Sequence, residues 1–385
     1  MTVQTMRRAD RFLGVPLCWL FGVLLPRSGN VIHRAPQNVL VIKFFGLGSI
    51  LLSTSALSLL KSSVPGVRII YLSFESNREL LERIPMIDEI VTIRGSSIPA
   101  FLHDTWNAIV RIRKVRPDVV LDLEFFSKFS TLLSVLSGAP RRVGFSLPAF
   151  WRSALVTDQV PLTKSRHVVE AFCDQVRVVA CSSAPAPHVA SPEINDSDSG
   201  QLKSIIGELM EPYIVVNINS GSTFFERRWP AERFSALVSR LSRNGSVRMF
   251  FTGSIDEKEY VQAMIDISGT AEISKNLAGR LTIPQLCALL RSSELLISND
   301  SAPLHIASAY GIPTVSLFGP ETPKFYGPVD SNGEVIYKGI ECSPCMNIYA
   351  AKTFWCPYNA RCMREIGVDE VEAAVLRILT PVTRV

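Results

Sequence analysis

The chain has 385 residues, of which 47% are hydrophobic and 19% charged, and its formal net charge is +5. This length exceeds one common domain and predicts two, while the absence of a long basic run with interleaved aromatic residues argues against nucleic acid as a partner. A mild basic excess suits anionic substrates or a membrane face. Eight cysteines lack the density of a secreted disulfide scaffold, which favours a reducing compartment.

Residues 1–36 differ in composition from the rest. Arginines flank the uncharged run 12–25 on both sides, at positions 7, 8, 11 and 27. As a helix this run would extend about 21 Å, short of the ~30 Å hydrocarbon core, so it should not span a bilayer. We expect an interfacial segment, with residues 7–27 on an anionic membrane surface and Trp19 at headgroup level. The alternatives are a signal peptide, for which no clear cleavage site follows, and an apolar helix docked on the protein itself.

A first alternation of strands and helices follows up to residue 180. Residues 38–45 read as a buried strand, 46–48 as a tight glycine turn and 49–61 as a helix. The later elements alternate in the same way: strands at 67–72, 89–93, 119–123 and 141–145, and helices at 76–83, 106–116, 130–136 and 167–180. Residues 182–200, rich in Ser, Pro, Ala, Asn and Asp, are interpreted as the linker.

The second half repeats this alternation. Strands are predicted at 213–219 and 247–252, and helices at 283–292 and 368–379. Between the last two helices, residues 296–320 read as a compact β-α-β unit: Ser298 to Ser301 supply side-chain oxygens for the helix start, Pro303 fits the first turn, and Gly311 ends the helix. The helix N-terminus suits a phosphate at the carboxyl edge of a parallel sheet, with His305 in its first turn. The alternative is an ordinary capped helix with a core histidine.

The run N-D-S-A-P-L-H-I-A-S-A-Y-G-I-P-T-V-S-L-F-G-P at 299–320 resembles the signature of glycosyltransferase family 9, the heptosyltransferases. Further segments resemble the family: the strand and turn from Val39 to Leu57, the R-x-G-F strand at 142–145, the R-x-W-P-x-E-x-F block from Arg227 and the N-L-x-G element at 276–279. The resemblance implies an α/β fold of GT-B type, with two facing Rossmann-like domains, parallel sheets and a cleft between them. The expected domains are 37–190 for the acceptor and 191–385 for the nucleotide sugar.

The resemblance also implies donor-binding positions. Hydroxyls and a cation suit a pyrophosphate in the block after strand 213–219, and an acid beyond the Gly253 turn, Glu257 or Asp256, would hold the ribose. Ala302 replaces a usual glycine of the signature. The expected donor-binding residues are Ser222, Thr223, Arg227, Glu257, Asp300, Ser301, Ala302 and His305.

On the acceptor side one residue departs from the family pattern. Where the family carries an Asp proposed as the general base, this chain has Ser49, whose hydroxyl cannot hold a proton at neutral pH without a partner base. Glu124, at the carboxyl end of strand 119–123, is the candidate substitute base, and the alternative is a solvated loop carboxylate. Lys43, Gly48 and Arg142 are expected to bind the acceptor.

The tail carries cysteines at 342, 345, 356 and 362. Two stand at C-x-x-C spacing, but the other spacings are looser than in a zinc ribbon or finger. Structural zinc is therefore not favoured, and no metal or cofactor is expected.

The resemblance implies inverting, metal-independent transfer of a sugar, heptose from ADP-heptose, to a lipid-linked envelope glycan such as the lipopolysaccharide core. The enzyme would work in the cytoplasm, peripherally on the inner face of the plasma membrane. Two alternatives remain: a transferase of the same fold with another nucleotide sugar, and a catalytically dead binding protein, suggested by Ser49.

Overall fold

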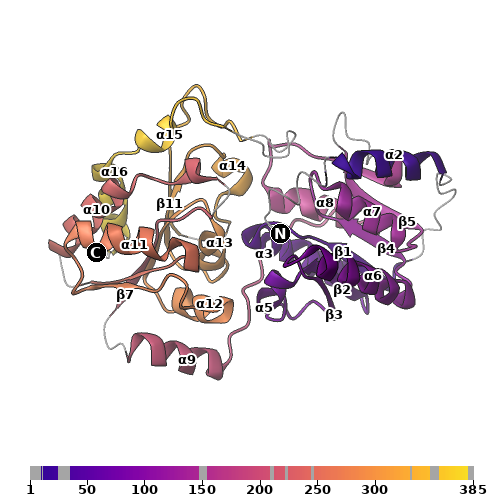
Figure 1. Cartoon of the computed structure of the whole chain (residues 1–385), viewed down its shortest axis with the longest axis horizontal. Helices are drawn as coiled ribbons and strands as arrows, with labels where there is room; N and C mark the ends of the chain where they lie inside the picture. Colours follow the sequence, from indigo (N-terminus) through magenta and orange to yellow (C-terminus); the bar gives the residue numbers. More distant parts are fainter. Residues whose placement is uncertain are drawn as a thin grey trace. The chain divides into compact units, whose positions relative to one another are not determined.

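The computed structural model describes residues 10, 12–24, 35–146, 154–208, 212–221, 224–243, 247–329, 332–346 and 355–379. Within these ranges the chain forms two compact α/β units that divide after Ala190 (Figure 1).

The first unit is built on a six-stranded parallel sheet. Its strand order is β3-β2-β1-β4-β5-β6, so the first strand lies between the second and the fourth. The strands are β1 (Asn38–Ile42), β2 (Arg68–Phe74), β3 (Glu89–Ile93), β4 (Val119–Asp122), β5 (Arg141–Ser146) and β6 (Asp158–Pro161). The helices are α2 (Gly14–Leu24), α3 (Leu47–Leu52), α4 (Thr54–Ser63), α5 (Arg78–Leu81), α6 (Ile98–Val115), α7 (Lys128–Leu136) and α8 (Val168–Ala180).

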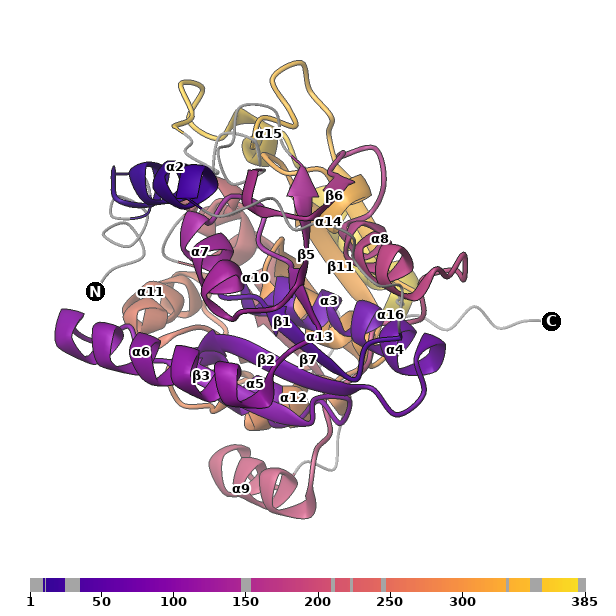
Figure 2. The ribbon, with the colours of Figure 1, turned by 90° about the vertical axis from the view of Figure 1, so that its right-hand side faces the viewer.

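Helices cover both faces of this sheet because its strands are apolar on both sides, as buried parallel strands are. Helices α6 and α7 lie on one side of β1 and β2, and α4 and α8 on the other (Figure 2). Alternate strand residues such as Leu40 and Ile42 join one core with α6 and α7. Because the strands are parallel and packed on both faces, their carboxyl ends form one defined edge of the sheet.

The second unit repeats the topology, with strand order β12-β11-β10-β7-β8-β9. The strands are β7 (Tyr213–Asn217), β8 (Arg248–Phe251), β9 (Ser274–Asn276), β10 (Leu295–Asn299), β11 (Thr314–Phe318) and β12 (Glu334–Tyr337). The helices are α9 (Asp196–Ile206), α10 (Ala231–Arg243), α11 (Lys258–Ser268), α12 (Ile283–Arg291), α13 (Ala302–Ala309), α14 (Pro323–Tyr326), α15 (Arg361–Arg364) and α16 (Val368–Leu379).

Trp229 is the largest fully buried side chain of this unit. It packs edge-on against Phe234 with ring centroids 4.8 Å apart, and its indole N–H donates to the Ile366 carbonyl at 3.0 Å. The W-P-x-E-x-F block therefore leads into α10 with its tryptophan buried in the core of this unit. The indole hydrogen bond to Ile366 attaches the C-terminal tail to the same core.

Three sequence predictions need correction. The helix predicted at 106–116 begins at Ile98, where the Ser97 hydroxyl accepts from the Ala100 amide. The segment predicted as a linker up to residue 200 ends inside α9, which a capping box of Asn195 and Asp198 starts. The helix predicted at 49–61 is two helices, α3 and α4, separated at Ser53.

The N-terminal apolar run forms α2, which packs on α7. Cys18 is fully buried in a small cluster with Leu132 and Leu155, while Trp19 on the same helix is 56% exposed. The helix thus combines docking on the protein with an exposed apolar side. Residues 1–9, 11 and 25–34, which include the flanking arginines, lie outside the described residues. In the described part of the chain, no helix combines the length and the apolar character needed to cross a bilayer.

Candidate active-site residues in the two units

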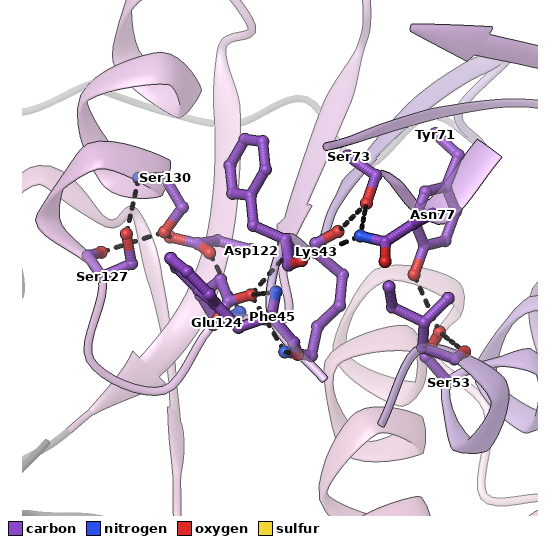
Figure 3. A network of polar contacts seen from close by, with 12 residues as sticks. Lys43, Phe45, Ser53, Tyr71, Ser73, Asn77, Asp122, Glu124, Ser127 and Ser130 are labelled. Atoms are coloured by element: carbon purple, nitrogen blue, oxygen red, sulfur yellow. Dashed lines mark hydrogen bonds and ion pairs between the residues drawn. The ribbon is translucent and has the colours of Figure 1, made fainter. Parts of the chain in front are cut away.

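In each unit, the strand order reverses between the first and fourth strands, and ligands of open α/β sheets bind outside the carboxyl ends at such a point. In the first unit, Lys43 follows β1 and Glu124 follows β4. The Lys43 ammonium donates to Glu124 Oε1 at 2.9 Å, and the same oxygen accepts the amides of Phe44 at 2.7 Å and Phe45 at 2.9 Å (Figure 3). The Glu124 carboxylate therefore bridges the reversal point and holds the loop after β1.

Asp122, the last residue of β4, positions Glu124 through a hydrogen bond to its backbone. Its Oδ1 accepts the Glu124 amide at 3.1 Å, and its Oδ2 accepts the hydroxyls of Ser130 and Thr131 at 3.0 Å each. The side chain of Gln175 donates to the Asp122 carbonyl at 2.9 Å. These bonds join β4, α7 and α8 into one buried polar network.

The loop after β1 is also held from the β2 side. The Ser73 hydroxyl donates to the Lys43 carbonyl at 2.6 Å, and the Asn77 amide donates to the Phe44 carbonyl at 2.9 Å (Figure 3). This loop leads directly into α3, which carries Ser49. Preorganised backbone at this edge is what an acceptor-binding loop requires.

The substitute-base role of Glu124 stays a prediction, and the geometry adds a second role. Glu124 is 1% exposed, and its Oε1 already accepts three hydrogen bonds. It is therefore not the solvated loop carboxylate of the alternative interpretation. Ser49 Oγ is buried and has no hydrogen-bond partner among the described residues.

Of the predicted acceptor residues, Lys43 and Gly48 lie at the loop after β1, whereas Arg142 lies elsewhere in the unit. Gly48 is buried within α3 near the same loop, while Lys43 is 2% exposed and engaged with Glu124. Arg142 lies near the start of β5, beside Val120, and so toward the opposite edge of the sheet from Glu124. Its guanidinium donates to the carbonyls of Leu155 and Ala139, and burial lowers its pKa. The structure does not bring Arg142 together with Lys43.

In the second unit, Arg227 and Asp300 make the corresponding connection across the reversal point between β7 and β10. The Arg227 Nη1 donates to Asp300 Oδ2 at 3.1 Å, and Nη2 donates to the Ser220 carbonyl at 2.8 Å. Asp300 is 5% exposed. Two predicted donor residues thus meet as an ion pair at the carboxyl edge of the sheet.

Asparagines at the ends of the central strands form a network that the sequence analysis did not single out. Asn217 donates to Ser298, Ser301 and the Asn219 carbonyl, and Asn299 accepts the Trp229 amide at 3.0 Å. Asn219 donates to the Thr252 carbonyl at 2.9 Å. The signal for this network was the pair of asparagines in V-V-N-I-N at a strand end.

Several buried polar atoms at this edge have no hydrogen-bond partner within the described chain. They are Asn219 Oδ1, Thr252 Oγ1, Arg227 Nε and Arg228 Nε. Leaving buried polar groups unpaired costs free energy, so such groups mark places where water or a ligand completes the bonding.

Helix α13 starts beside the Arg227–Asp300 pair. Pro303 occupies the first turn as predicted, but the expected side-chain cap is wrong: Ser301 makes no capping hydrogen bond in the described structure, and its hydroxyl donates instead to the Asn299 carbonyl at 3.1 Å. Ala302 is partly exposed, and His305 is 4% exposed. Pro303 carries no N–H and the Leu304 amide donates to the Ser301 carbonyl at 3.2 Å, so within the described first turn the Ala302 amide is the one suited to an external anion.

Glu257, predicted to hold the ribose, is fixed by neighbours. Its Oε2 accepts the Ser254 amide and hydroxyl at 2.9 Å each, and its Oε1 accepts Arg228 at 2.8 Å. The Arg228 guanidinium also lies over the rings of Phe225 and Tyr260, 4.6 and 4.8 Å from their centroids. Asp256, the other candidate, is exposed.

Two predicted donor residues, Ser222 and Thr223, lie outside the described residues. The four tail cysteines are described and all are free thiols. Within the described ranges, no group of three or more His, Cys, Asp or Glu side chains could hold a metal ion.

Comparison with known proteins identifies the family. The model of glycosyltransferase family 9 (heptosyltransferase) matches residues 106–354, well over half of the chain. The chain belongs to glycosyltransferase family 9.

Curated relatives agree with this assignment. Lipooligosaccharide heptosyltransferase 2 of Campylobacter jejuni is 30% identical over 171 residues, 43% of this chain; that match spans about half of the relative's length, 52%. Lipopolysaccharide heptosyltransferase 3 of Escherichia coli is 26% identical over 294 residues, 74% of this chain and 84% of the relative. Lipopolysaccharide heptosyltransferase 2 of Salmonella typhimurium is 24% identical over 315 residues, 78% and 88% of the two chains.

Solved structures agree on the fold. ADP-heptose lps heptosyltransferase II of E. coli matches with a TM-score of 0.71 at 20% identity, over 89% of this chain and 98% of that chain. A glycosyltransferase of family 9 from Veillonella parvula matches with a TM-score of 0.72 at 23% identity, over 92% and 99%. The predicted α/β fold of GT-B type, with two parallel-sheet Rossmann-like units, is confirmed.

Proposed function

We propose that this family 9 protein transfers heptose from ADP-heptose to a lipid-linked envelope glycan such as the lipopolysaccharide core, with inversion at the sugar carbon. The observation that carries the proposal is the carboxyl edge of the second sheet, where Arg227, Asp300 and the start of α13 lie together. An edge with a guanidinium and the positive end of a helix dipole suits a nucleoside diphosphate. The heptosyltransferase names of the curated relatives support the choice of sugar.

In this mechanism, the second unit stabilises the leaving group. As the bond from the sugar to the diphosphate breaks, charge grows on the phosphate oxygens. The Arg227 guanidinium, oriented by Asp300 and the Ser220 carbonyl, and the N-terminal end of α13 would bind that charge without reorganising. His305 in the first turn would contact the same group. We propose that this set acts without a metal ion.

The first unit would bind the acceptor and remove the proton from its hydroxyl. Ser49 cannot hold that proton alone, so Glu124 is the proposed base. Because its Oε1 accepts Lys43 and two loop amides, Glu124 would have to loosen one of these bonds only if the proton were taken at Oε1. In this proposal Lys43 orients the Glu124 carboxylate before the reaction and stays beside the protonated carboxyl group afterwards.

We place the enzyme in the cytoplasm, peripherally on the inner face of the plasma membrane. A lipid-linked acceptor is confined to a membrane, and the exposed side of α2, with Trp19 and Leu17, suits the interface. The donor is a soluble nucleotide sugar, which reaches the enzyme from the aqueous side.

The test is release of nucleoside diphosphate from a panel of ADP-heptose, GDP-mannose and UDP-glucose, with and without lipid-linked core acceptor. We expect acceptor-dependent release from ADP-heptose alone. Release from GDP-mannose or UDP-glucose instead would show that the donor is a different nucleotide sugar. Donor binding without turnover, against a matched assay of a curated heptosyltransferase with the same acceptor, would establish the non-catalytic binding protein instead.

A further inference from the structure

Helix α6 carries a line of large apolar side chains on its solvent side. Ile98 is 60% exposed, Leu102 61%, Trp106 67% and Val110 37%. Their spacing of four residues places them along one side of the helix, over about 18 Å. We call these four residues the α6 stripe. Soluble proteins rarely expose contiguous apolar patches of this kind unless the patch binds something.

The stripe is not the side by which the helix is attached. The attached side carries Ala108 and Ile112, which are buried in the core of the first unit. Phe101 also faces that core, and its ring centroid lies 5.1 Å from that of Phe129 on α7. Packing against the sheet therefore leaves the stripe exposed in the part of this unit that the structure describes.

The charges beside the stripe are mainly positive. Asp104 is the only acid in the sequence of α6, and the Arg94 guanidinium binds it at 2.7 Å. The helix ends in Arg113 and Lys114, and Arg116 follows directly. An apolar stripe that ends in a group of cations is complementary to a bilayer with anionic headgroups.

A hollow of about 450 Å³ lies at this basic end, lined by Arg113, Arg116, Pro117, Asp118, Ser137, Gly138 and Pro140. The Asp118 carboxylate already accepts the backbone amides of Gln37 and Asn38, both at 2.8 Å. The two arginines are left as the charged groups suited to the phosphate of a headgroup.

Helix α2 supplies a second exposed apolar surface on the same side of the first unit. It packs on α7, and α7 contacts α6, so the three helices follow one another on one side of the sheet (Figure 2). The exposed apolar residues of this helix are Leu17, Trp19, Leu20 and Val23.

We propose that the α6 stripe docks on an anionic lipid bilayer, so that the first unit binds the membrane through α6 as well as through its N-terminal helix. A tryptophan beside leucine and isoleucine suits the boundary between headgroups and acyl chains. The cations at the end of α6 favour a bilayer over a second copy of this chain, whose net charge is also positive. This proposal goes beyond the transferase activity and does not depend on it.

The test compares the full-length protein with the double variant Leu102→Gln/Trp106→Gln in sedimentation with vesicles. The vesicles contain either phosphatidylglycerol with phosphatidylethanolamine or phosphatidylcholine alone. We expect wild type to prefer the anionic vesicles and the double variant to bind them at least tenfold more weakly. Arg113→Gln/Lys114→Gln should lower binding to anionic vesicles only. The control is Ile267→Gln on α11, an apolar residue 71% exposed in the second unit, which should bind as wild type.

The outcomes distinguish a bilayer from a second copy of this chain as the partner of the α6 stripe. Unchanged vesicle binding by the folded double variant, with circular dichroism as the check, would overturn the proposal. A double variant that binds vesicles normally but changes from dimer to monomer in analytical ultracentrifugation would assign the stripe to a second copy. The assay contains neither donor nor acceptor, so loss of the proposed transferase activity would not affect it. ADP binding by the double variant should remain as in wild type.

Discussion

The Lys43 ammonium and the Glu124 carboxylate are 81 positions apart in the sequence and 2.9 Å apart in the structure, with side chains 2% and 1% exposed. In the second unit Arg227 and Asp300 are 73 positions apart and 3.1 Å apart. Each pair joins the loops that follow the first and fourth strands of its sheet. Within each unit, therefore, an ion pair joins two loops at the point where the strand order of its sheet reverses.

Replacing Lys43 should destabilise the protein strongly. Lys43→Met leaves the Glu124 carboxylate buried without its counter-ion, and breaking one partner of such a pair costs about 3–5 kcal/mol. Urea denaturation should show this as a lower midpoint. The control is Lys61→Met, which removes an exposed pair with Asp88, and its effect should stay below ~1 kcal/mol. Equal effects of the two variants would show that burial of the Lys43 pair carries no special stabilisation.

Turnover by Glu124 variants should distinguish a base from a loop anchor. Removing a general base costs about 10²–10⁴ in rate, so we expect Glu124→Gln to lower kcat far more than Lys43→Met, which keeps the carboxylate. Similar kcat losses in the two variants would leave Glu124 as a positioning residue only.

Arg227 should contribute directly to donor affinity. Charge-assisted hydrogen bonds to phosphate are worth about 1.5–3 kcal/mol, so Arg227→Met should weaken ADP binding by about 10–100-fold in calorimetric titration. Arg227→Lys keeps the charge but not the two-pronged geometry and should fall between. Arg240→Met, which removes an exposed arginine from α10, is the matched control. ADP affinity unchanged in Arg227→Met would remove this residue from the donor site.

Glu257 should recognise the ribose hydroxyl. Wild type should bind ADP more tightly than 2′-deoxy-ADP by about tenfold, as for one hydrogen bond to a charged group. In Glu257→Gln, we expect that preference to shrink to a few-fold. The comparison of two ligands within each variant cancels any general effect of losing the Arg228 pair. An unchanged preference would assign the ribose contact elsewhere, with Asp256→Asn as the next variant.

Two tail thiols should react slowly at moderate pH. Burial raises the pKa of Cys345 to about 11 and that of Cys362 to about 12, and neighbouring cysteines add to both shifts. Because the reactive thiolate forms only as pH rises toward those values, iodoacetamide at pH 8 should modify both at least tenfold more slowly than the exposed Cys181. Mass spectrometry of pulse-labelled protein measures these rates.

The same shifts have a consequence for stability. A raised folded-state pKa means that the stabilising contribution of the neutral thiols is complete below ~8.5, the unfolded value, and is lost as pH rises through about 11 to 12. We expect the labelling of Cys345 and Cys362 to accelerate in that alkaline range. Rapid labelling of both at pH 8 would contradict the raised pKa values.

Local features were predictable from sequence because they depend on residues close together in the chain. The strand at Glu89–Ile93 and the helix at Val368–Leu379 have the predicted bounds. The β-α-β unit around α13 was also readable, since strand, Pro303 and Gly311 follow one another directly. The family signature lies in this local unit.

Pairings between distant segments required the tertiary structure. Glu124 meets Lys43 only because β1 lies between β2 and β4, an order that periodicity does not contain. The apolar spacing of α6 likewise does not say which residues face the sheet, and Trp106 points outward while Ala108 is buried. The α/β class and the family follow from the sequence alone, because they depend on local patterns and motifs. Which charges pair and which apolar side chains remain at the surface depends on the strand order and packing of the tertiary structure.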